Sequence, residues 1–297
     1  MRGLPPSRGC PYNKLMPHPV IFDRRLLRAR LARAAAIGPA TFLLDRAADE
    51  IAERLSAVLR TFDVAVDLGT PTDAVRRAIA GRVGTAVAVV ADEEALPFRD
   101  ASLDLVVSAL ALQFVNDLPG TLIQIRRALK PDGLLLAALA GGDTLIELRQ
   151  AFAAAEAEIE DGVSPRVAPF SDVRDMGALL QRAGFALPVT DVDRIIVRYR
   201  SPLALMHDLR RMGATNPLVE RSRRPLKRAI LLRMMEIYAE RFSDPDGRVR
   251  ATFEIVWLSG WAPHVSQQKP LAPGSARQRL ADALGTRETK LPSDGGR

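Results

Sequence analysis

The stretch DVAVDLG at residues 63–69 is a short apolar run that ends in glycine. Such a run is typical of a strand that is covered on both faces, as the strands of parallel sheets are. Similar runs follow near residues 85–92, 103–110 and 134–139, and helical patterns separate them. Because strands and helices alternate, we predict an α/β fold with a doubly wound, mainly parallel sheet and right-handed crossovers.

Further helices are predicted on both sides of these strands. Apolar side chains recur at helical spacing over residues 22–59, and Gly38-Pro39 divides that segment into two helices. Ser171 is expected to cap a later helix. In chain order, the other predicted elements are helices at 71–81, 116–129, 143–160, 171–184, 201–212 and 225–242, strands at 191–199 and 250–260, and a short helix at 277–284.

The composition divides the chain into four segments. The first segment holds five prolines and no acidic side chain, so we expect a disordered extension, with Met16 as an alternative start of translation. In chain order the segments are the extension 1–19, an N-terminal helical segment 20–62, the α/β domain 63–265 with a helical insertion at 200–245, and a C-terminal tail 266–297.

The composition also excludes several classes of protein. The 297 residues are 47% hydrophobic and 26% charged, as in ordinary globular proteins, and no apolar run approaches the ~20 residues of a membrane span. Cys10 is the only cysteine, which excludes an internal disulfide and favours a reducing compartment. The net charge of +7 comes from arginines spread along the chain, and only 5% of residues are aromatic, so we do not expect a nucleic-acid partner.

Ligands of a parallel α/β sheet bind beyond the carboxyl ends of its strands. That rule directs attention to Gly69, Asp92, residues 108–113 and Gly141-Gly142. The three histidines, at positions 18, 207 and 264, are not spaced from a carboxylate as metal ligands usually are. We therefore predict an organic ligand and no metal at this edge of the sheet.

The order of these features resembles the class I S-adenosylmethionine-dependent methyltransferases. In that family the first strand ends in Asp-x-Gly-x-Gly-x-Gly, an acid follows the second strand, and an acid precedes Leu-Pro-Phe. Here DLG at 67–69, DEEALPF at 92–98 and the turn KPDG at 130–133 match. The resemblance implies a Rossmann-like fold that binds S-adenosylmethionine. The residues implied to hold the cofactor are Asp67, Gly69, Asp92, Glu93 and Ser108.

Other stretches resemble a narrower branch, which contains the biotin-synthesis malonyl-acyl-carrier methyltransferases and mitochondrial complex I assembly factor 5. They are IFDR at 21–24, LALQFVNDLPG at 110–120, GVSPR at 162–166, MGATN at 212–216 and GWAPH at 260–264. This resemblance implies either methyl transfer or hydroxylation of an arginine on a respiratory complex I subunit. It also implies a cytoplasmic protein in a bacterium, or a mitochondrial matrix protein in a eukaryote.

Two departures from the methyltransferase pattern affect the predicted cofactor site. The string TPTD at 70–73 replaces the glycines and is typical of a helix start, with Thr70 as N-cap and Pro71 at the first helical position. Asp73 would then repel the carboxylate of the cofactor. Asp92 is the first acid after Asp73, so we infer that the usual second strand is missing and that a six-stranded sheet lacks one wall of the pocket.

Each candidate residue also has an ordinary structural explanation. Asp67 at a strand end would serve equally as a cap or an ion-pair partner, and Asp92 with Glu93 would also suit a solvated loop. Ser108 is small, so it could be present only because it fits the packing around its strand. The residues past the third strand that suit either substrate contact or helix capping are Gln113, Asn116 and Asp117.

Three functions are compatible with these patterns. The first is methyl transfer, which needs no catalytic base because alignment of the reactants supplies most of the rate. The second is a non-catalytic assembly factor or chaperone that has lost the cofactor, which the missing glycines favour. The third, arginine hydroxylation, follows only from the family resemblance. An adenosyl-sized cavity beside Gly69 would distinguish the first function from the second.

Overall fold

A computed structural model describes residues 20–89, 92–160, 162–268, 281–282 and 285–286. The chain divides into a compact unit that ends at Pro263 and a second unit that begins at His264. The elements below belong to the first unit, and none of its described helices is long and apolar enough to cross a membrane. The extension predicted at 1–19, and all but residues 281–282 of the helix predicted at 277–284, lie outside the described residues.

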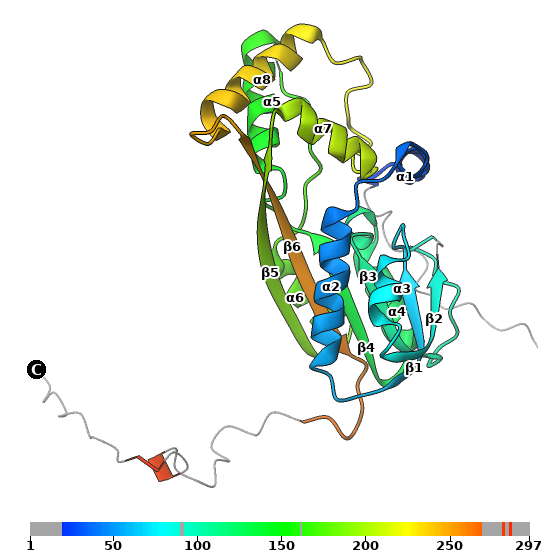
Figure 1. Ribbon diagram of the computed structural model, residues 1–297. Helices are drawn as coiled ribbons and strands as arrows, with labels where there is room; N and C mark the ends of the chain where they lie inside the picture. The colour runs from blue at the N-terminus through cyan, green and yellow to red at the C-terminus, as the bar shows by residue number, and fades with distance from the viewer. Residues whose placement is uncertain (1–19, 90–91, 161, 269–280, 283–284, 287–297) are drawn as a thin grey trace, which may run out of the picture. The chain divides into compact units, whose positions relative to one another are not determined.

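The first unit is built on a six-stranded sheet with the strand order β2-β1-β3-β4-β6-β5 (Figure 1). Neighbouring strands are parallel from β2 to β4, and β6 runs antiparallel to both β4 and β5. The strands are β1 (Phe62–Leu68), β2 (Val83–Val89), β3 (Leu103–Ala109), β4 (Leu129–Ala140), β5 (Ala186–Tyr199) and β6 (Val249–Trp261). The mainly parallel sheet of six strands is therefore confirmed, and β2 pairs only with β1 among the described strands.

Helices cover both faces of this sheet, as a doubly wound fold requires. On one face, α2 (Phe42–Ser56) and α3 (Ala74–Ile79) share a core with the strands. On the opposite face, α4 (Leu118–Ala128) and α6 (Val173–Arg182) do the same. Two-sided burial explains why five of the seven side chains in each of β1 and β3 are apolar.

Three further helices form a layer beyond the short strands, which we call the cap layer (Figure 1). They are α5 (Ile146–Ile159), α7 (Pro202–Arg211) and α8 (Arg228–Phe242), and they share a core with the near ends of β5 and β6. β5 has 14 residues and β6 has 13, against 7 in β1, so at ~3.3 Å per residue they extend about 20 Å farther. Helix α1 (Arg24–Ile37) lies against α7.

The helix start predicted at Thr70 is wrong. α3 begins only at Ala74, and residues 70–73 form a loop. The Thr70 hydroxyl is buried, and it accepts a hydrogen bond of 3.4 Å from the backbone N–H of Ala109. This contact ties the loop to β3 and leaves no Thr70 side chain to cap a helix.

Other boundaries differ from the prediction in smaller ways. α6 is capped by Asp172 rather than Ser171, because the Asp172 carboxylate accepts a hydrogen bond of 2.8 Å from the N–H of Arg174. β4 and β5 begin earlier than predicted, at Leu129 and Ala186, since pairing with β3 and β6 continues past the apolar runs.

Candidate functional site

A cavity of about 440 Å³ lies at the carboxyl ends of the parallel strands. One wall is the chain at the ends of β1, β3 and β4, at Gly69, Leu110 and Ala140. The other walls come from α1, the start of α2, the helices α5 and α7, and the first half of β6. Sites for small molecules typically measure about 300–1,000 Å³, and α/β sheets bind their ligands at this edge.

Three residues past the ends of these strands line the cavity with a left-handed backbone. The angle φ is +75° at Gly69, 51° at Leu110 and 57° at Leu145. Such a conformation costs a non-glycine residue ~1–2 kcal/mol, and strain of this kind clusters at functional sites. A Cβ at Gly69 would lie 2.9 Å from the Cβ of Ala111 and 3.0 Å from Oε1 of Glu93. Glycine therefore brings bare backbone to the cavity wall.

The loop after Gly69 lines the cavity without filling it. Pro71 and Thr72 are wall residues of the cavity, as Gly69 is. The carboxylate of Asp73 lies 3.5 Å from the guanidinium of Arg77, one turn along α3. Asp73 therefore has a cationic partner and is not among the residues that line the cavity, and the repulsion of a cofactor carboxylate stays a prediction.

Asp67 lies near the end of β1 and is almost completely buried, with 1% of its surface exposed. It is not one of the residues that line the cavity. The guanidinium of Arg76 lies 3.6 Å from its carboxylate. Burial raises the pKa of Asp67 to about 6, and the Thr70 hydroxyl and the Arg76 charge lower it by less. A buried carboxylate with so little compensation is typical of a functional site.

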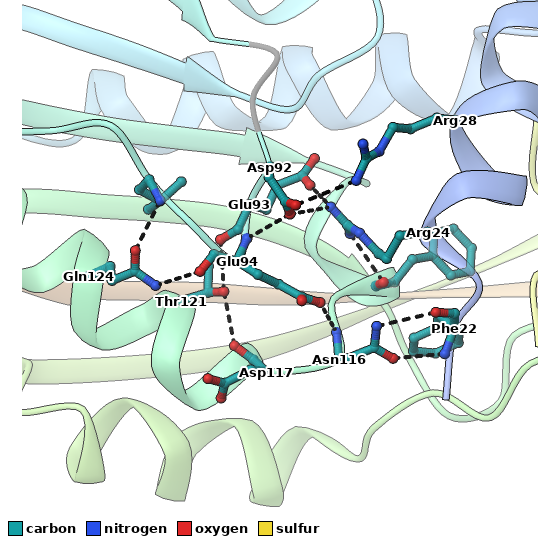
Figure 2. Close-up of polar contacts among 12 residues, drawn as sticks. Phe22, Arg24, Arg28, Asp92, Glu93, Glu94, Asn116, Asp117, Thr121 and Gln124 are labelled. Carbon is teal, nitrogen blue, oxygen red and sulfur yellow. Dashed lines mark hydrogen bonds and ion pairs between the residues drawn. The ribbon is translucent and has the colours of Figure 1, made fainter. Parts of the chain in front are cut away.

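The predicted acid pair meets two arginines of α1 (Figure 2). Arg24 pairs with Glu93 and lies 3.4 Å from Asp92, and Arg28 lies 3.5 Å from Asp92. Glu93 lines the cavity beside Gly69, with 14% of its side chain exposed. The Asp92 side chain is 46% exposed and lies outside the cavity wall. Only Glu93 of this pair therefore reaches the cavity.

The loop that carries Glu93 is fixed on α4 (Figure 2). The Thr121 hydroxyl donates a hydrogen bond of 2.9 Å to the carbonyl of Glu93. The side-chain amide of Gln124 donates to the carbonyl of Glu94 at 2.9 Å and accepts from the N–H of Leu96 at 3.0 Å. These contacts fix the backbone of the loop from which the Glu93 side chain reaches the wall.

Asn116 and Asp117 have structural roles. The Asn116 side chain accepts hydrogen bonds of 2.8 Å from the N–H groups of Ile21 and Phe22, and it donates to the carbonyl of Phe22 at 3.2 Å (Figure 2). Asp117 caps α4 by accepting from the N–H of Gly120 at 2.9 Å. The capping explanation is thus correct for Asp117, whereas Asn116 anchors the segment that leads into α1.

Ser108 and Gln113 differ in their access to the cavity. Ser108 is fully buried, lies outside the wall, and donates a hydrogen bond of 2.8 Å to the carbonyl of Leu68, which links β3 to β1. Gln113 lies in the 3-10 turn η2 (Leu112–Phe114) and lines the cavity. Its Nε2 donates to the carbonyl of Leu110 at 2.7 Å, while its buried Oε1 has no hydrogen-bond partner among the described residues.

Glu254 is a cavity residue that was not predicted from the sequence. It lines the cavity from β6, and its backbone is fixed by the Thr144 hydroxyl, which accepts from the Glu254 N–H at 3.1 Å and donates to its carbonyl at 3.0 Å. The carboxylate lies over Gly141, where a Cβ would overlap Oε1. The available signal was a single charge within the otherwise uncharged run at 251–260.

The arrangement suits an organic ligand. No three His, Cys, Asp or Glu side chains gather as a metal site within the described parts of the chain. The cavity offers mainly apolar walls, bare backbone at Gly69, and the carboxylates of the wall residues Glu93 and Glu254. Carboxylate oxygens accept hydrogen bonds, so these groups fit a ligand that carries N–H or O–H donors.

Comparison with known proteins identifies relatives along most of the chain. Residues 49–137 match the methyltransferase domain family. The chain is 37% identical to the mitochondrial arginine-hydroxylase NDUFAF5 of Danio rerio, over 92% of each chain. It is 40% identical to the Homo sapiens protein of the same name, over 86% of this chain and 81% of that one. The malonyl-[acyl-carrier protein] O-methyltransferase of Laribacter hongkongensis is 43% identical over 63% of this chain and 60% of its own.

A solved structure shares the fold. The YcgJ protein of Bacillus subtilis superposes with a TM-score of 0.50 at 12% identity, over 74% of this chain and 99% of that one. The relatives named NDUFAF5 are similar enough, over enough of their length, to decide the family. The chain therefore belongs to the methyltransferase-domain family that includes the NDUFAF5 arginine hydroxylases.

Proposed function

We propose that this chain is an enzyme that binds S-adenosylmethionine in the cavity beside Gly69 and acts on a side chain of another protein. The observation that carries the proposal is the open cavity at the carboxyl ends of β1 and β3, where family members would place their cofactor. The six-stranded sheet does not close this space, and the loop at 70–73 borders it.

The residues of the wall fit parts of such a cofactor. The Gly69 backbone would allow close approach, and the Glu93 carboxylate would accept from the hydroxyl groups of a ribose. Asp67 would act from behind the wall as a buried negative charge near a cationic ligand. Asp92 and Ser108 take supporting roles, because the first contacts the arginines of α1 and the second links β3 to β1.

Methyl transfer from S-adenosylmethionine requires little acid or base catalysis by the side chains of the protein. When bound, the cofactor supplies an electrophilic methyl group on a sulfonium. The protein contributes alignment, which can provide most of the rate of such a transfer, and apolar walls that exclude water.

A second candidate function is hydroxylation of a protein arginine, a two-electron oxidation that would need dioxygen and a source of electrons besides this chain. Relatives that carry the name arginine-hydroxylase align over 86–92% of this chain, whereas the O-methyltransferase of Laribacter aligns over 63%. We extend the proposal to a subunit of respiratory complex I as the protein substrate. The reaction would take place in the mitochondrial matrix of a eukaryote or in the cytoplasm of a bacterium, and the mitochondrial relatives support a mitochondrial location in a eukaryote.

A non-catalytic assembly factor of the same fold is the alternative. The pairing of Glu93 with Arg24 favours it, because this carboxylate already has a cationic partner. β2 also favours this alternative, because it lies at the edge of the sheet. No described strand lies beyond it to close that side of the pocket.

Isothermal titration of the full chain with S-adenosylmethionine separates an enzyme from an assembly factor. We expect binding tighter than about 100 μM. No binding up to 1 mM, which corresponds to about −4 kcal/mol, would leave only the non-catalytic function.

Mass spectrometry then separates the two reactions. Arginine peptides of complex I subunits are compared between a strain that lacks the gene and its parent. A methyl group that disappears with the gene supports methyl transfer, and an oxygen atom that disappears supports hydroxylation. Unchanged peptides would remove complex I arginines as the substrate.

A further inference from the structure

The charged side chains that line the cavity are partnered, with one exception. Glu93 pairs with Arg24. The four lining arginines each donate to an acceptor of the chain: Arg30 to the carbonyl of Thr215 at 2.6 Å, Arg166 to Glu156 at 2.7 Å, Arg211 to the carbonyl of Gly38 at 2.8 Å, and Arg221 to the carbonyl of Leu218 at 2.6 Å. The Glu254 carboxylate has neither a hydrogen bond nor an ion pair within the described residues.

The backbone that carries this unpartnered carboxylate is fixed by hydrogen bonds, and the neighbouring residue leaves room for the side chain. The Thr144 hydroxyl holds both backbone groups of Glu254, and the N–H of Gly141 donates to the Glu254 carbonyl at 2.8 Å. Gly141 leaves room for the carboxylate, which a Cβ would overlap. A half-buried carboxylate without a partner among the described residues is available to a ligand of opposite charge.

Glu254 lies at the end of the cavity away from the cofactor loop. Gly69 follows β1, and the strands β3, β4 and β6 come next across the sheet. Three strand spacings separate β1 from β6, which is about 14 Å. A cofactor beside Gly69 and Glu93 therefore leaves Glu254 to the second reactant.

We infer that Glu254 selects that reactant by binding the guanidinium group of a protein arginine. The inference rests on the proposed function, because it names the acceptor for the same cavity. A guanidinium carries five donors in one plane, so it can donate two parallel hydrogen bonds to one carboxylate. The apolar walls suit the aliphatic part of the arginine side chain.

The test uses the full chain and small mimics of a protein arginine. N-acetyl-arginine amide is titrated into protein that is saturated with S-adenosylhomocysteine. The citrulline analogue, which has nearly the same shape without the charge, and the lysine analogue are titrated in parallel. The variants are Glu254→Gln and, as a matched control for one lost charge, Glu220→Gln, which is exposed and lies outside the cavity wall.

We expect the wild type and Glu220→Gln to bind the arginine mimic at least about tenfold more tightly than the citrulline mimic. Glu254→Gln should lose that preference while its affinity for S-adenosylmethionine stays within about twofold of the wild type. Equal binding of the arginine and citrulline mimics by the wild type, a preference for lysine, or a large loss of cofactor affinity in Glu254→Gln would overturn the inference. Failure of the wild type to bind the cofactor at all would refute the proposed function instead.

Discussion

Replacing Asp67 by asparagine should stabilise the folded protein at neutral pH. Burial raises the pKa of the Asp67 carboxyl from 3.8 to about 6, although the Thr70 hydroxyl and the Arg76 charge act in the opposite direction. That difference corresponds to about 3 kcal/mol of unfavourable free energy for the ionised carboxylate in the folded state. Asparagine has nearly the same shape and carries no charge, so it avoids this cost.

The direction of the pH dependence follows from the two pKa values. Below about pH 4 the carboxyl is protonated in both the folded and the unfolded state, and it costs nothing. As the pH rises from about 4 to 6, the unfolded state ionises first, so the wild type loses stability through this window. Above pH 6 the loss is complete, and the advantage of the variant stays constant.

Urea unfolding at pH 4 and at pH 7.5 measures this difference. We expect Asp67→Asn to exceed the wild type by about 3 kcal/mol at pH 7.5 and by much less at pH 4. Asp63→Asn, on the same strand but exposed, serves as the control and should change little at either pH. A variant that is less stable than the wild type at pH 7.5, or an advantage of equal size at both pH values, would refute the reasoning. Asp67→Asn should also bind S-adenosylmethionine more weakly, because it removes the buried negative charge that we place near the cationic ligand. The residue would then lower stability and support binding at the same time.

Three further predictions concern the wall and the attachment of α1. Gly69→Ala should lose stability by at least ~1–2 kcal/mol in urea unfolding and should abolish cofactor binding in titration, because φ is +75° and the new Cβ meets Ala111 at 2.9 Å; unchanged cofactor affinity would contradict this. Arg24→Gln should cost about 2 kcal/mol, since it leaves Glu93 without its partner, whereas the exposed Arg25→Gln should cost little; equal effects would be inconsistent with the pairing. Asn116→Ala should speed hydrogen exchange at residues 21–30 by at least about tenfold, and unchanged protection would show that other contacts hold α1.

The fold was predictable where the signal is local. The apolar run at 63–69 and the break at Gly38-Pro39 define β1, α1 and α2 within a few residues. In each of these elements the apolar residues that become buried recur at a regular spacing within the element itself, so the sequence alone shows the pattern. The same holds for Asp117, because a helix cap is decided within three residues.

The site was less predictable because its contacts are distant in the chain. Thr70 has the residue type of a helix cap, yet its hydroxyl contacts Ala109, 39 positions away. The acid at Glu93 pairs with Arg24, 69 positions away. Glu254 reaches the cavity only because β6 lies beside β4, an adjacency that no local pattern encodes.

Photo-cross-linking tests most directly whether the cavity beside Gly69 holds an adenosyl cofactor. The full chain is irradiated with S-adenosylmethionine that carries a radioactive methyl group, and the labelled peptides are mapped. We predict label in peptides that contain residues 69–72 or 110–114, both of which contribute to the cavity wall, and suppression of that label by excess S-adenosylhomocysteine. Absence of label, or label confined to peptides remote from this wall, would contradict the claim.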